Sequence, residues 1–338
     1  MSLEVHIYGP GFGETIFLRW PKAGGGWHGA LVDAHCPRGG EWLAGKLREL
    51  ELTELEFVVA THPHLDHIRN FAAGLHRSEV SVAQGFYWPG LSASYALIFF
   101  GRLADQNPEA HLETAKMIRQ WFGYWGPPFK KDRPAPRDLG GASDFPVVYS
   151  TTADGSPLRV KAIGPWLEGI NRFVKNVSTS IGRRGKIDYE HREANAVSIA
   201  LLIEYGDAQI VLGGDMEEVN WEALQREFHR PKFQPSLVKV SHHGSPNGRI
   251  NGMWPSGIGF FDGKGEKPIA VVTPWHQAGG KLPNGNAVLN EIRGAGFTVY
   301  VTGEGSPRYK DLESHVSIRL NPDRTAPVVF DQFKVRTV

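Results

Sequence analysis

The chain has 338 residues, of which 41% are apolar and 22% charged, enough for one large domain or two ordinary ones around a substantial core. The formal net charge of +1 excludes a partner selected by bulk charge, so a site for a polyanion would have to be a local patch. No apolar stretch approaches the ~18 residues of a membrane helix, and the N-terminal segment lacks a basic leader before an apolar core. The single cysteine, Cys36, excludes an intramolecular disulfide. We therefore expect a cytoplasmic protein without a membrane partner.

The predicted elements begin with short strands separated by glycine-rich turns over residues 4–33. A helix is expected at 41–51, followed by a buried strand at 56–60. The later strands are expected at 158–163, 196–204, 209–212, 237–240, 269–273 and 298–301, and the later helices at 109–122, 217–227 and 286–295. Interleaved strands and helices over this length predict layered α/β packing.

Two segments do not follow this pattern. Residues 85–144 are rich in aromatic side chains and include a basic, proline-rich stretch. Residues 171–195 are polar, and we interpret them as a basic loop that leads towards the later strands. We predict a single domain over residues 1–338, with both segments as insertions on its core.

A dense group of polar side chains follows the buried strand at 56–60: His62, His64, Asp66 and His67. Imidazole and carboxylate groups are ligands that suit zinc and related divalent ions. Residues two apart in extended backbone point the same way, so His62 and His64 can bind one ion. Asp66 and His67 lie where the chain is expected to turn into a helix, and they can face a second ion. The alternative, a set of surface histidines, fits poorly with four potential ligands directly after a buried strand.

The pattern His-x-His-x-Asp-His at 62–67 resembles the signature of the metallo-β-lactamase fold superfamily. Two later motifs follow in the order that this superfamily has: Gly213-Gly214-Asp215 resembles its Gly-Asp turn, and Lys-Val-Ser-His-His-Gly-Ser at 239–245 resembles its later histidine motif. Asp33 resembles the early aspartate that supports the metal ligands from behind. The resemblance implies a four-layer αββα sandwich with the active site at one edge.

Within the superfamily, the chain resembles the hydrolase domain of the ComEC group of DNA-uptake proteins. The similar features are the glycines of 9–13, the segment 195–198 before a strand, the two later motifs and Thr-Pro-Trp-His at 273–276. They extend over most of residues 4–303, and the two predicted insertions fall outside them. The glycines of 9–13 could also be interpreted as a phosphate loop, but a tight turn between two strands fits their spacing better.

The resemblance implies two metal ions, the first bound by His62 and His64, the second by Asp66, His67 and His243, and both by Asp215. We prefer His243 to His242 as the ligand because it directly precedes the turn glycine, as in similar motifs. His242 is then a proton donor or a supporting residue. Asp66 also has a catalytic role, because its carboxylate can accept a proton from the attacking water.

Zinc is the first expectation for the metal, and manganese is the alternative because the ligand set contains aspartates and no cysteine. Many members of the superfamily supply a third histidine to the first metal site. The corresponding region here, 193–198, contains no histidine, and His191 is the nearest imidazole. Either His191 or water would complete the site, so we predict that the first site is the weaker one.

Three classes of function remain open. The first is hydrolysis of a phosphodiester or another anionic substrate, a small molecule or nucleic acid, held by Arg183, Arg184 and Lys186 in the basic segment. The second is hydrolysis of a lactam, lactone or thioester. The third is a metal-binding module without activity. The basic segment favours the first class, and the sequence does not predict the oligomeric state.

Overall fold

The structure is a computed structural model. It describes residues 2–10, 13–36, 39–89, 101, 104–105, 108–125, 136–139, 145–153, 155–182, 192–227, 233–249, 253–254, 261, 267–275, 287–303 and 313–338.

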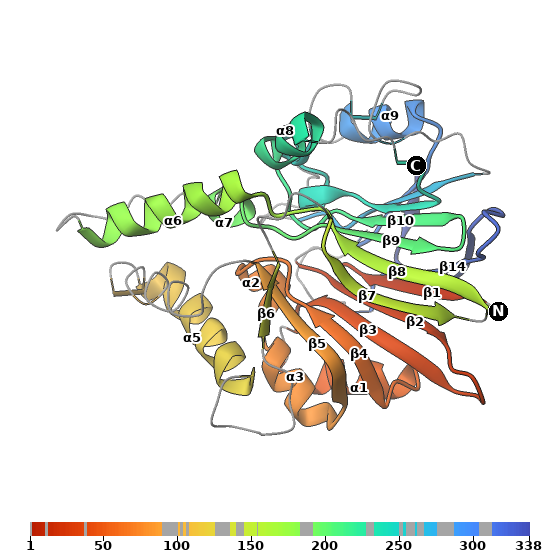
Figure 1. Cartoon of the computed structure of the whole chain (residues 1–338), viewed down its shortest axis with the longest axis horizontal. Helices are drawn as coiled ribbons and strands as arrows, with labels where there is room; N and C mark the ends of the chain where they lie inside the picture. Colours follow the sequence, from red (N-terminus) through yellow and green to blue (C-terminus); the bar gives the residue numbers. More distant parts are fainter. Residues whose placement is uncertain are drawn as a thin grey trace.

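Two eight-stranded sheets form the centre of the molecule (Figure 1). The first has the order β15 (Val328–Phe333), β14 (His315–Leu320), β1 (Leu3–Tyr8), β2 (Thr15–Pro21), β3 (Trp27–Ala34), β4 (Glu54–Val59), β5 (Ser81–Pro89) and β6 (Pro136–Leu139). The second has the order β16 (Arg336–Thr337), β13 (Thr298–Val301), β12 (Ile269–Val272), β11 (Leu237–Lys239), β10 (Ala208–Leu212), β9 (Leu201–Tyr205), β8 (Ser156–Ala162) and β7 (Val147–Ala153).

Each sheet combines antiparallel and parallel pairs. In the first sheet β1, β2 and β3 are antiparallel neighbours, whereas β3 to β6 run parallel. In the second sheet β8, β9 and β10 are antiparallel, whereas β10 to β13 run parallel. Parallel neighbours end at the same edge of their sheet, so the loops that follow these strands gather there.

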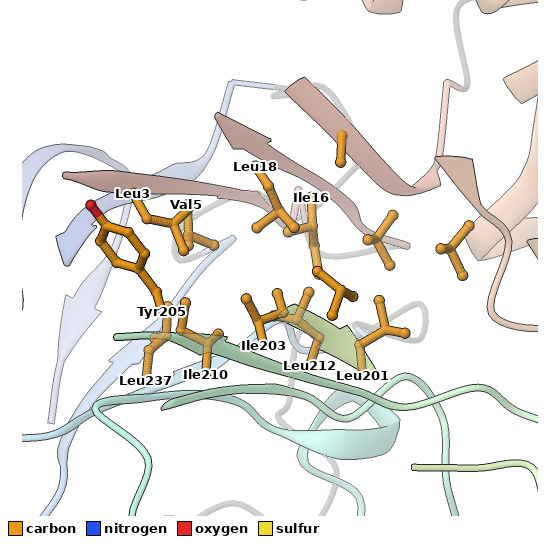
Figure 2. Close-up of a cluster of buried hydrophobic side chains, with 14 of the residues drawn as sticks. Leu3, Val5, Ile16, Leu18, Leu201, Ile203, Tyr205, Ile210, Leu212 and Leu237 are labelled. Atoms are coloured by element: carbon orange, nitrogen blue, oxygen red, sulfur yellow. The ribbon is translucent and has the colours of Figure 1, made fainter. Parts of the chain in front are cut away.

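The main core lies between the two sheets. Apolar side chains alternate along the strands, so that one face of each sheet is turned towards the other. Figure 2 shows Val5 and Leu18 of the first sheet facing Ile203 and Leu212 of the second. Most side chains of this cluster are buried, which is the main stabilising contribution expected for such packing.

Helices cover the outer face of each sheet (Figure 1). On the first sheet these are α1 (Glu41–Glu49), α3 (Phe71–Ser78) and α5 (Pro108–Trp125), and on the second α8 (Glu218–Glu227) and α9 (Ala287–Gly294). The helices α2 (Leu65–Ile68), α6 (Leu167–Gly182) and α7 (Arg192–Asn195) lie together at one end of the sandwich. No helix in the described part of the chain is both long and apolar enough to span a bilayer.

The order of layers, helices then two sheets then helices, confirms the predicted αββα sandwich. Parts of both segments predicted as insertions form regular elements. Residues 85–89 continue β5, and β6 adds a further strand to the same sheet.

The prediction of a loop over the basic segment is wrong for its first part, which is helix α6. Ile170 and Phe173 are buried there, whereas Arg172 and Lys175 are exposed. The apolar positions recur with the helical period, and the charged residues between them face away from the core.

Two further differences concern strands. The strand predicted to start at 196 starts at Leu201, because residues 196–200 form the buried connection from α7. The sequence analysis missed β14 and β15, which join the first sheet beside β1 although they follow it by some three hundred positions.

Candidate metal centre

The histidine motif follows β4, as the spacing predicts. His64 retains an extended backbone, with φ −98° and ψ 148°, directly before α2 begins at Leu65. His62 lies three residues after β4, in the bend that leads to α2, whereas Asp66 and His67 lie in the short helix. The Nε2 atom of His62 lies 3.0 Å from Nδ1 of His64, so the two rings converge. Burial lowers the pKa of His62 well below its usual value, which keeps the ring neutral and able to bind a metal.

Asp33 supports this motif from the end of β3. Because β3 and β4 are parallel neighbours, Asp33 lies beside Thr61. Its carboxylate accepts hydrogen bonds from the Thr61 backbone N–H and hydroxyl, both at 2.7 Å, and from Nδ1 of His67 at 2.7 Å. With Nδ1 committed to Asp33, Nε2 of His67 is the nitrogen available to a metal.

Asp215 lies at the turn after β10. A Cβ atom at Gly214, where φ is +52°, would meet the Ile199 carbonyl oxygen at 2.4 Å, so the turn requires glycine. The backbone N–H of Asp215 donates to Ser198 Oγ at 2.8 Å. Its carboxylate lies between the other side chains, and its oxygens are 3.4 Å from Nε2 of His67, 3.6 Å from Nε2 of His62 and 3.7 Å from Nε2 of His243.

The two adjacent histidines after β11 point in different directions. Both have positive φ, 47° at His242 and 55° at His243, within the short turn Ser241–Gly244. His243 donates from Nδ1 to the Thr273 carbonyl oxygen at 2.8 Å, and its Nε2 lies 3.0 Å from Asp66 Oδ2. His242 instead lies 3.4 Å from Oε1 of Glu217 through Nδ1.

Three groups of potential donor atoms lie here: Glu14, Asp33 and His67 form one, and the other two share Asp215. Of these two, the first consists of His62, His64 and Asp215, the second of Asp66, His67, Asp215 and His243, and within each group the donor atoms all lie within 4.8 Å of one another. Nε2 of His67 and Oδ1 of Asp215 are buried and, within the described residues, have no hydrogen-bond partner. Buried imidazole and carboxylate atoms that converge without partners fit a divalent cation.

The electrostatics of the second group also fit a cation. Although burial acts in the opposite direction, the neighbouring histidines hold the pKa of Asp66 and Asp215 well below the usual range. Likewise, despite burial, Asp215 and Asp33 raise the pKa of His67 well above its usual value. The carboxylates therefore favour a positive charge among them, which a metal ion would supply in place of protonated histidine.

Four predicted residues lie outside the described residues: Arg183, Arg184, Lys186 and His191. Asn195 lies in the region where many superfamily members have a third histidine. Its side chain contacts Glu217 and His242, not His62 or His64. Its amide donates to Glu217 at 3.0 Å and lies 3.3 Å from Nε2 of His242.

Sequence reasoning missed three polar residues around the centre: Glu14 and Lys239, which form a salt bridge, and Glu217, which lies beside His242. One of them had a recognisable signal, because Lys239 is a charged residue within the apolar run of 237–240. The other residues belong to no motif that would have marked them in the sequence.

No protein family profile and no curated protein matches the chain. Among solved structures it is similar to the metallo-β-lactamase SMB-1 bound to 2-mercaptoethanesulfonate, with 11% identity and a TM-score of 0.37 over 70% of this chain and 76% of that one. The MIM-2 metallo-β-lactamase has 11% identity and a TM-score of 0.35 over 70% and 72% of the two chains. Zinc-bound PqqB from Methylobacterium extorquens has 8% identity and a TM-score of 0.31 over 70% and 72%. Likeness at this level carries no chemistry over to this chain, and these comparisons do not show the finer resemblance to the ComEC group.

Proposed function

We propose that the chain is a metal-dependent hydrolase of the metallo-β-lactamase type that acts in the cytoplasm. One observation carries the proposal: two groups of buried histidine and aspartate donors converge at one end of the sandwich and share Asp215. A purely structural cluster would be expected to satisfy its buried polar atoms internally, whereas Nε2 of His67 and Oδ1 of Asp215 have no hydrogen-bond partner among the residues that the structure describes.

In this proposal His62 and His64 would hold a first ion, Asp66, His67 and His243 would hold a second, and Asp215 would contribute to both sites. Zinc suits this ligand set, and manganese is the alternative because the set has aspartates and no cysteine. When bound, such ions make a hydroxide nucleophile available near neutral pH and take up charge on the attacking and leaving oxygens.

The chain's own residues then manage protons and orientation. Asp66, which its histidine neighbours hold in the ionised form, would accept the proton of the attacking water on its carboxylate. Asp33 holds the His67 ring with Nε2 directed at the centre.

Two roles were predicted for His242, proton donor or supporting residue. With Glu217 at Nδ1 and the amide of Asn195 at Nε2, the contacts favour the supporting role. Burial also lowers the pKa of His242, which favours the neutral form of the ring.

For the substrate, we favour a phosphodiester or another anionic group, held by Arg183, Arg184 and Lys186. This choice rests on the basic composition of residues 171–195 and on α6, whose described part carries exposed Arg172 and Lys175. A lactam, lactone or thioester is the second candidate, and a metal-binding module without turnover is the third.

The test begins with the metal content of protein purified without chelator, followed by hydrolysis of a chromogenic phosphodiester and a neutral ester. Asp66→Ala should abolish hydrolysis while leaving the circular dichroism spectrum unchanged. Glu222→Ala, which removes an exposed carboxylate on α8, is the matched control and should hydrolyse like the parent. A parent that takes up neither zinc nor manganese, or an Asp66→Ala variant with normal turnover, would contradict the proposal.

A further inference from the structure

A buried ion pair joins the two sheets directly behind the metal centre. Glu14 precedes β2 in the first sheet, and Lys239 ends β11 in the second. Their side chains form a salt bridge and are 1% and 0% exposed. Two charges removed from water in this way carry a large desolvation penalty, and hydrophobic residues would often stabilise a core equally well. A function beyond stability is therefore a reasonable expectation for the pair.

Glu14 is connected to two of the segments that carry metal-binding side chains. Its backbone N–H donates to the Asp66 carbonyl oxygen at 3.0 Å. Its carboxylate accepts the Thr273 hydroxyl at 2.7 Å, and the carbonyl oxygen of the same threonine accepts Nδ1 of His243. Glu14 therefore holds the residue that orients the His243 ring.

The approach of Glu14 to the helix α2 segment depends on the preceding glycine. Gly13 has φ +77°, and a Cβ atom there would lie 2.3 Å from the Asp66 carbonyl oxygen. Only glycine allows the two backbones to come this close.

Lys239 is connected to the remaining segments. Its carbonyl oxygen accepts the N–H of Gly213, the first residue of the turn that carries Asp215, at 3.1 Å. It also precedes by two residues the turn Ser241–Gly244, which carries His243. One ion pair thus connects the backbones that present Asp66, Asp215 and His243.

The pair also affects the charge of the centre. Glu14, Asp33 and Asp215 are buried carboxylates, and Glu14 lies 3.8 Å from Nδ1 of both His67 and His243. The ammonium group of Lys239 lies beside the Glu14 carboxylate and offsets one of these buried negative charges.

We propose that Glu14 and Lys239 are positioning residues for the second metal site: the ion pair locks Thr273 and the three ligand-bearing segments so that His243 and His67 present Nε2 to the ion. This inference rests on the proposed function. It predicts that replacing the pair lowers the affinity for the metal as well as the activity. Supporting residues behind metal ligands typically change metal affinity by about 10- to 100-fold when they are replaced.

The experiment titrates Zn²⁺ into the metal-free chain of 338 residues in competition with a chromogenic chelator, alongside urea unfolding of the same samples. Glu14→Gln keeps the side-chain shape but places an amide beside Lys239 and Thr273. The double variant Glu14→Gln/Lys239→Met removes both charges, so no buried charge is left unpaired. It serves as the folded variant if Glu14→Gln alone does not fold.

Glu4→Gln is the matched control. Glu4 is 2% exposed and paired with Arg19 and Arg319, but it lies near the opposite end of β1 from the residues that lead to Glu14. We expect Glu14→Gln and the double variant to lower the affinity of the tighter Zn²⁺ site by about 10- to 100-fold, and Glu4→Gln to leave it unchanged.

The outcomes separate the two proposals. If the parent binds no Zn²⁺, the proposed function fails, and this inference fails with it. If the parent binds Zn²⁺ and the double variant binds it equally well, the pair only stabilises the fold and this inference alone is overturned.

Discussion

Replacing Asp33 by Asn would test how the centre sets the metal-binding nitrogen of His67. Asp33 is fully buried and has a φ of 55°, in the left-handed region. Asn tolerates that conformation and matches Asp in shape, so the backbone should not change. The substitution therefore changes two things: an amide donor replaces one acceptor oxygen, and the negative charge beside His67 is lost.

The contacts of Asp33 allow the effect to be estimated. Oδ1 accepts the Thr61 backbone N–H, and Oδ2 accepts both the Thr61 hydroxyl and Nδ1 of His67. In the variant the amide nitrogen would replace Oδ2. The hydroxyl can rotate and accept, but His67 can accept only if its proton moves from Nδ1 to Nε2. Losing the bond to a charged acceptor should lower the free energy of unfolding of the metal-free protein by about 2 kcal/mol.

The larger effect should be on the metal. With its proton on Nε2, His67 has no lone pair for the ion, so the affinity of the second site should fall by about 10- to 100-fold. Urea unfolding of the metal-free protein measures the first effect, and Zn²⁺ titration against a competing chelator measures the second.

Thr61→Val is the matched control for this experiment. It removes one hydrogen bond to Asp33, but it leaves the contact between Asp33 and His67 intact. The hydroxyl also lies 3.0 Å from Nδ1 of His62, so any effect on metal should fall on the first site. The reasoning is refuted if Asp33→Asn binds Zn²⁺ at the second site as tightly as the parent.

Three further predictions concern the first metal site, the substrate and pH. The first site has three described donors and the second has four, so Zn²⁺ titration should give two unequal affinities. His62→Ala should remove the weaker site. Two equal affinities would indicate a further ligand to the first site, and His191 would be the first residue to replace. Neutralising Arg183, Arg184 and Lys186 together should slow phosphodiester hydrolysis and flatten its salt dependence but spare a neutral ester; unchanged rates and salt slope would favour the lactam, lactone or thioester class. Despite burial, hydrogen bonds from His6, Arg319 and Arg19 lower the pKa of Glu4 from 4.5 to about 2. Its stabilising contribution should therefore be complete above about pH 5 and be lost as the pH falls towards 2, so Glu4→Gln should unfold in urea with a weaker acid dependence; a parental dependence would contradict this.

Local pattern was sufficient where the chemistry is encoded in neighbouring residues. A buried strand followed by His-x-His-x-Asp-His predicts that four potential ligands leave one strand end together, because a strand and a short helix set the direction of each side chain. The Gly213-Gly214-Asp215 turn is predicted from its resemblance to the superfamily motif, and the structure gives the physical reason for the glycine: Gly214 allows a close backbone approach that other residues do not.

The contacts that convert these segments into one centre depend on pairing between distant strands. Asp33 reaches His67 only because β3 and β4 are parallel neighbours, and Glu14 meets Lys239 only because the two sheets pack face to face. The strands β14 and β15 also complete the first sheet from the far end of the sequence. Periodicity describes which side of an element is apolar, but it does not specify which element that side packs against. The sequence by itself therefore determined which side chains can bind a metal. Only the tertiary structure decided which other buried side chains, such as Asp33 and Glu14, hold those metal-binding side chains in place.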